Sequence, residues 1–158
     1  DRRIVTAPMP SCPHRLPGFK TTCLIVCGLE APLAASILLR GVRSSMAPFG
    51  VPDAVLDAPH YQDAILWVYT HMLVLGLVIG LVGLYAEGER LQRNFARLML
   101  AAHLVYFWLD LRASDSALGT GLYHGPGSLA PVVICLVITL LFAHLALCRR
   151  PADILPRA

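Results

Sequence analysis

The chain has 158 residues, of which 56% are hydrophobic, and its mean hydropathy is +0.64. A soluble domain of this size would expose much of that apolar surface to water, so the composition excludes an ordinary soluble domain and indicates an integral membrane protein. The net charge of +3 comes from cations at the ends of apolar segments. They lack the interleaved aromatic residues of a nucleic-acid-binding groove, so no nucleic-acid partner is expected.

The chain is predicted to begin with an extended arm and to continue as a bundle of membrane helices. Residues 1–20 are rich in proline, which rules out a continuous helix there. Crossing a hydrocarbon core takes about 20 helical residues. The third apolar segment is the shortest, so its end charges must snorkel or be buried against a neighbouring helix. We predict one all-α domain, a four-transmembrane-helix bundle with a short inner tail at 149–158, whose spans are about 21–39, 64–86, 95–112 and 129–148.

The cations are distributed unequally about these segments. Of the 13 Lys and Arg residues, only Arg40, Arg43 and Arg112 belong to the two connections on one side, and the other ten lie on the opposite side. The positive-inside rule assigns those ten to the cytoplasmic or matrix side. Both termini are therefore expected on that side, in a bacterial inner membrane or a mitochondrial inner membrane.

The first apolar segment carries a carboxyl group at its centre. Glu30 lies ten residues from both Lys20 and Arg40, or about 15 Å from each at 1.5 Å per residue, close to the bilayer midplane. Ionisable groups inside a membrane are costly and are candidate functional sites. In the second segment, His71 lies about 12 Å below the outer boundary, so we expect it to meet Glu30. This pair would fix the helix register, relay a proton, hold a polar ligand group, or contact a partner protein.

Three glycines in the second segment predict close helix packing. Gly76, Gly80 and Gly83 include a GxxxG spacing, which lets another backbone approach closely without naming the partner. Beyond this segment, Arg90, Arg93 and Arg97 share one helical face. Together with Arg149 and Arg150, after the fourth segment, they lie at headgroup level and are expected to contact anionic lipid.

Two histidines form a second candidate constellation. His103 and His144 each lie about 8 Å from the inner boundary by residue count, on different helices. Bis-imidazole ligation of haem b requires two histidines at equal depth, so a b-type haem is one alternative, although no cofactor is otherwise expected. Cys23 and Cys27 share a face with Glu30, but cysteine is also a normal filler in packed helices, so no metal site is predicted.

No motif of a hydrolase or metalloprotease occurs in the sequence, which favours a role without catalysis. The first functional hypothesis is therefore a small, non-catalytic helical subunit of a larger membrane assembly, such as an energy-transducing complex. Its partners would be lipids and other membrane subunits, or further copies of itself. The second hypothesis is a small membrane enzyme or carrier that binds a lipophilic ligand or relays protons through Glu30 and His71. The third is the haem protein.

Overall fold

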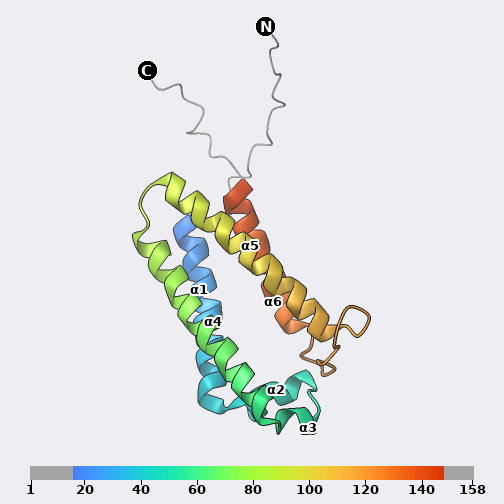
Figure 1. Cartoon of the computed structure of the whole chain (residues 1–158). Coiled ribbons are helices and arrows are strands. Elements are labelled where there is room, and N and C mark those ends of the chain that lie inside the picture. Colours follow the sequence, from blue (N-terminus) through green and yellow to red (C-terminus); the bar gives the residue numbers. More distant parts are fainter. Residues whose placement is uncertain (1–15, 148–158) are drawn as a thin grey trace, which may run out of the picture.

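The computed structural model describes residues 16–147, and over that range the chain is helical without any strand (Figure 1). The all-α prediction is therefore confirmed. The long helices are α1 (Phe19–Arg40), α4 (Pro59–Tyr85), α5 (Glu89–Ser114) and α6 (Ala130–Leu147). Between α1 and α4 lie the short helices α2 (Val42–Met46) and α3 (Asp53–Leu56) and the 3-10 helix η1 (Ala47–Phe49). The expected arm at 1–20 and tail at 149–158 lie largely outside the described residues, although α1 already begins at Phe19.

Glycine and proline define several helix ends. The cap residue of α1 is Gly41, whose φ of +84° is a conformation that other residues rarely adopt. α4 begins at Pro59, where the missing N–H would have no partner within the helix anyway. Gly88, with a φ of +88°, precedes α5. In contrast, Pro32 lies inside α1 and does not end it.

α1, α4 and α6 are long and apolar enough to cross a membrane. α5 has 26 residues but contains charged groups near both ends, and its composition is not apolar enough by the same standard. The described residues therefore hold three candidate membrane-spanning helices, together with one further long helix where the third span was expected.

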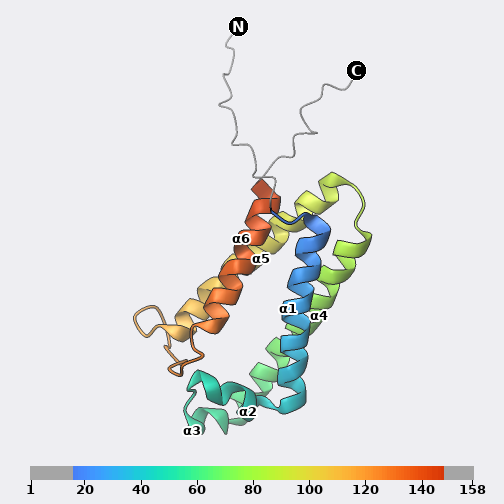
Figure 2. The ribbon, with the colours of Figure 1, turned by 180° about the vertical axis from the view of Figure 1, so that it is seen from behind.

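The long helices form two antiparallel pairs, which meet at one end of the molecule and diverge toward the other (Figures 1 and 2). α1 packs along α4 and α5 packs along α6, whereas contacts between the pairs are few. The buried positions of α1 recur at spacings of three and four, which is the pattern of closely aligned helices. They include Phe19, Cys23, Val26, Glu30, Ala34 and Ile37.

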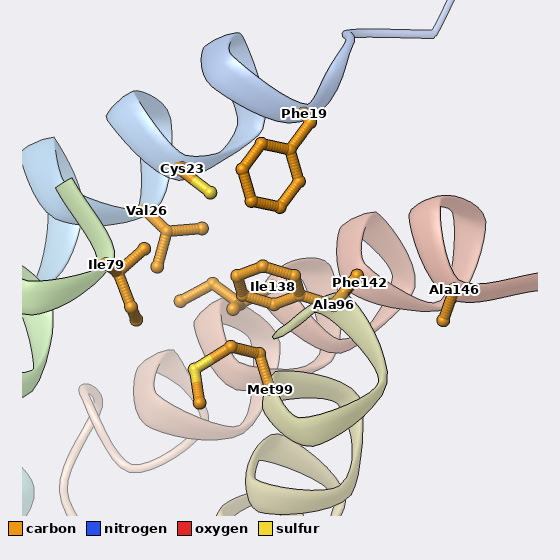
Figure 3. Packing of buried hydrophobic residues seen from close by; sticks show 9 residues of the cluster. All are labelled: Phe19, Cys23, Val26, Ile79, Ala96, Met99, Ile138, Phe142 and Ala146. Carbon is orange, nitrogen blue, oxygen red and sulfur yellow. The ribbon is translucent and has the colours of Figure 1, made fainter. Parts of the chain in front are cut away.

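An apolar cluster joins the two pairs at the end where α1 begins and α6 ends (Figure 3). We call it the inner cluster. The ring of Phe19 meets that of Phe95 edge to face, with centroids 6.1 Å apart. Its buried members are Phe19, Cys23, Val26, Ile79, Ala96, Met99, Ile138, Phe142 and Ala146. Because all four long helices contribute, this cluster holds the bundle together at that end.

The opposite end is closed by the short helices and by the loop at 115–129. A second apolar cluster, the outer cluster, is centred on Ile37, Val42, Met46, Val51 and Leu56. The loop adds Leu122 and Tyr123, and the Tyr123 ring lies 5.5 Å from that of Phe49. Burial raises the pKa of Tyr123 above its ordinary value. On the exposed side, Arg43 bonds to Asp57 and to Asp53, the latter at 3.0 Å.

The loop and η1 cross with their backbones in contact. The Gly125 N–H donates to the Phe49 carbonyl at 2.8 Å. A Cβ atom at Gly125 would lie 2.3 Å from the carbonyl oxygen of Pro48, and one at Gly50 would lie 2.3 Å from the Gly125 nitrogen. Only glycine therefore permits this crossing.

Replacing Gly125 with alanine is expected to push the loop off η1 and to cost about 1–3 kcal/mol through overpacking. Limited proteolysis in detergent should then cut the 115–129 loop faster than in the wild type. Gly127→Ala is the matched control, because its Cβ would lie 3.3 Å from the same Pro48 oxygen and needs only a small adjustment. Equal protection of both variants would show that the close crossing does not secure the loop.

Candidate functional site

A buried hydrogen bond between a carboxyl group and an imidazole lies between the two helix pairs. His103 Nε2 of α5 and Glu30 Oε1 of α1 are 2.9 Å apart. Glu30 is 5% exposed and His103 is 1% exposed, so neither group is reached by solvent. The second carboxyl oxygen, Glu30 Oε2, is buried and has no hydrogen-bond partner. The hydrogen bond between Glu30 and His103, which joins the α1 and α4 pair to the α5 and α6 pair, is therefore the candidate functional site.

Helix periodicity brings these two side chains inward. On α5 the buried residues are Ala96, Met99 and His103, spaced by three and four, while the rest of the helix is partly or fully exposed. Glu30 belongs to the buried stripe of α1. It is the twelfth of 22 residues in α1, and His103 is the fifteenth of 26 in α5, so both lie near the middle of their helices.

The second ring nitrogen of His103 is also engaged. His103 Nδ1 lies 2.8 Å from the carbonyl oxygen of Met99 in the preceding turn. From α6, the thiol of Cys135 donates to the His103 carbonyl at 3.4 Å, and the ring of Phe142 lies 5.4 Å from the imidazole. The ring of Tyr106 stands edge-on at 5.6 Å. The imidazole is therefore held by its own helix and by α6 while it faces Glu30.

The glycines of α4 complete the site from behind Glu30. A Cβ at Gly76 would lie 3.2 Å from Glu30 Cβ and 3.2 Å from the Ala31 nitrogen. The corresponding distances are 2.7 Å from Gly80 to Cys27 Sγ and 2.4 Å from Gly83 to Cys23 Cβ. The close helix contact expected of these three glycines thus falls on α1, a partner that the sequence did not name.

His71 does not meet Glu30, and the pairing that we expected is corrected. His71 lies on the exposed side of α4, where its Nδ1 approaches the Trp67 carbonyl at 2.8 Å and its ring lies 4.0 Å from the Trp67 ring. Gly76, not His71, is the α4 residue that faces Glu30. A relay or ligand site built on Glu30 would therefore involve His103.

The helix that carries His103 extends beyond the predicted span of 95–112, so the depth counted for this residue does not give its position along the helix. The estimate counted from Arg97, whereas α5 begins two turns earlier, at Glu89. Arg90, Arg93 and Arg97 therefore belong to α5, and Arg93 bonds to Glu89. His103 consequently lies at the level of Glu30. Arg149 and Arg150 lie outside the described residues.

His103 and His144 are not brought face to face. Phe142 is the α6 residue beside the His103 ring, and His144 follows it by two residues, or about 200° around the helix. In addition, His103 already uses both ring nitrogens, on Glu30 and on Met99. The pair of axial ligands expected for a haem is not formed by this arrangement.

Residues 16–147 contain no group of three or more His, Cys, Asp or Glu side chains placed to hold a metal ion. Cys23, Cys27 and Cys135 are free thiols. Cys23 is buried in the inner cluster, Cys27 lies against Gly80, and Cys135 is buried with its thiol on the His103 carbonyl.

No protein-family model, no curated protein and no solved structure matches this chain. Its function has to be argued from the residues and their geometry.

Proposed function

We propose that this chain is a four-span membrane protein that serves as a non-catalytic helical subunit of a larger membrane assembly. The membrane would be an energy-transducing one, such as a bacterial inner membrane or a mitochondrial inner membrane. Both termini would lie on the cytoplasmic or matrix side, where Arg90 and Arg97 would contact anionic headgroups.

The outward face of α5 supports the proposal that α5 spans the membrane together with α1, α4 and α6. Leu98, Leu104, Val105, Trp108 and Leu109 are exposed along it, and their surface is suited to lipid. His103 is turned inward and paired. Asp110 is only partly buried and lies in the last turns, near the end of α5, where a charge is less costly than at the bilayer centre.

The observation that carries the subunit proposal is an exposed histidine in the middle of α4. Of the three candidate membrane-spanning helices, α4 is the most open, because only 17% of its apolar stretch is buried, compared with 39% for α1 and 33% for α6. His71 is the thirteenth of its 27 residues. In a membrane, an exposed polar group at that depth faces hydrocarbon unless another protein covers it.

The hydrogen bond of His71 indicates the chemistry of that partner. The Trp67 carbonyl can only accept, so His71 Nδ1 donates, and Nε2 of the neutral ring is left as an acceptor. A two-fold contact that brought two His71 rings together would set two acceptors against each other. A different chain whose membrane helix offers a hydroxyl or amide donor is therefore favoured over a second copy.

Replacing His71 with leucine is expected to weaken this assembly about tenfold, since one interhelical hydrogen bond in a membrane is worth about 1–2 kcal/mol. The measurement is the amount of partner polypeptide that copurifies with the tagged chain from native membranes in mild detergent. Thermal stability of the separated chain should not change, because His71 is exposed. His60→Leu makes the same change at the start of α4 and should leave copurification intact.

Unchanged copurification with the His71 variant would contradict the proposed contact. So would a wild-type chain that runs as a monomer and brings down no other polypeptide.

A further inference from the structure

The hydrogen bonds of His103 define the number of protons at the buried site. The Met99 carbonyl can only accept a hydrogen bond, so Nδ1 of His103 carries a hydrogen and donates it. In a neutral imidazole the other nitrogen is then an acceptor. Nε2 nevertheless lies 2.9 Å from Glu30 Oε1, which in a carboxylate is also an acceptor.

Two acceptors cannot share a hydrogen bond, so this contact needs one further proton. The proton lies either on Glu30, as a carboxylic acid that donates to a neutral imidazole, or on Nε2, as an imidazolium that donates to a carboxylate. Both forms have zero net charge. Removing the proton leaves a buried carboxylate facing a lone pair, and adding a second leaves a buried cation without a counterion.

The surroundings of Glu30 favour the carboxylic acid. Glu30 Oε2 has no donor, and leaving a carboxylate oxygen unsatisfied in an apolar interior costs more than leaving the carbonyl oxygen of an acid unsatisfied. α4 presents Gly76 to Glu30, and α6 presents Cys135 and Phe142 to His103. The other acids of the four long helices are Asp63 of α4 and Glu89 and Asp110 of α5.

We propose that Glu30 and His103 form a proton-binding site in the interior of the bundle, which holds one proton in the hydrogen bond between α1 and α5. Because this hydrogen bond joins the two helix pairs in addition to the apolar inner cluster, occupancy of this site contributes to how firmly the α1 and α4 pair is held to the α5 and α6 pair. This site is independent of the exposed face of α4.

The proton itself can be detected by infrared spectroscopy of the purified chain in detergent at neutral pH. A carboxylic acid shows a carbonyl stretch that shifts in D₂O. We expect such a band to be absent in Glu30→Gln and to persist in Asp110→Asn, the matched variant at another acid. Nitrogen NMR of labelled histidine should show His103 protonated at Nδ1 alone.

The coupling can be tested with the pH dependence of thermal unfolding. We expect the midpoint for the wild type to fall as the pH is raised from neutral and the shared proton is lost. In Glu30→Gln the amide N–H still donates to Nε2 and does not titrate in this range. The unfolding midpoint of this variant should therefore depend less on pH than that of the wild type. The tyrosines remain in both proteins, so their titration cancels in the comparison.

An acid band that depends on Glu30, or a His103 ring protonated at both nitrogens, supports a one-proton site. A carboxylate at Glu30 together with a neutral His103 in the folded protein overturns it. Parallel pH curves for the wild type and Glu30→Gln overturn the proposed coupling, and a Glu30→Gln variant that does not fold at neutral pH overturns it as well, since the amide preserves the hydrogen bond.

Discussion

Replacing His103 with leucine is expected to lower the free energy of unfolding by about 3 kcal/mol. The substitution removes the only partner of Glu30 in this structure and leaves the whole carboxyl group buried without a hydrogen bond. It also removes the ring contact with Phe142, which leucine restores only in part. Reversible unfolding in mild detergent, followed by circular dichroism, measures the effect.

The double variant His103→Leu with Glu30→Leu separates the hydrogen bond from packing. Two apolar side chains of similar size leave no buried polar group, so we expect the double variant to recover most of the stability lost by the single one. A double variant that is less stable than His103→Leu would show that the buried pair contributes net stability in its own right, contrary to this expectation.

Replacing Gly83 with alanine is expected to destabilise the protein by about 2 kcal/mol, although alanine is the better helix former. A Cβ at this position would lie 2.4 Å from the Cβ of the fully buried Cys23, so α4 must move away from α1. Such a movement also disturbs the contact of Gly76 with Glu30 on the same face. Thermal unfolding in detergent is the measurement.

Gly28→Ala is the control for helix propensity. Gly28 lies in α1 with nothing within 4 Å of its missing Cβ, so alanine should stabilise there by about 0.5–1 kcal/mol. Adding Cys23→Gly to Gly83→Ala should cost less than the sum of the two single changes, because it removes the clashing atom. Simple additivity would contradict close contact between these two positions.

Much of the fold could be predicted from the sequence, because helix content and helix position depend on local composition. The apolar lengths indicated helices at four places in the chain, and a long helix lies at each of them. The glycine spacing in α4 predicted a close helix contact, which the structure places on α1. α5 begins at Glu89, before the predicted span of 95–112, because charged residues at a membrane surface can continue a helix.

The candidate site could be predicted only in part. Glu30 was singled out because it lies in the middle of an apolar segment. That criterion finds a buried carboxyl group but does not identify its partner. His103 was also singled out, but it was predicted to pair with His144, and Glu30 was predicted to pair with His71. Residue counting gives a depth along each helix, whereas the partner also depends on the direction in which each side chain points. His71 and Gly76 show this, because they lie on opposite sides of α4 and only Gly76 faces Glu30.

The sequence by itself determined that this protein is helical and apolar, with cations gathered toward one side and a carboxyl group at the centre of its first helix. These properties depend on the order of residues along single helices. Only the tertiary structure decided that α1 pairs with α4 and α5 with α6, and that Glu30 meets His103. The physical reason is that helix pairing depends on rotation about each axis and on the shapes of facing surfaces. Here the Cβ-free face of α4 lets α1 approach closely, and α1 in turn presents Glu30 toward α5.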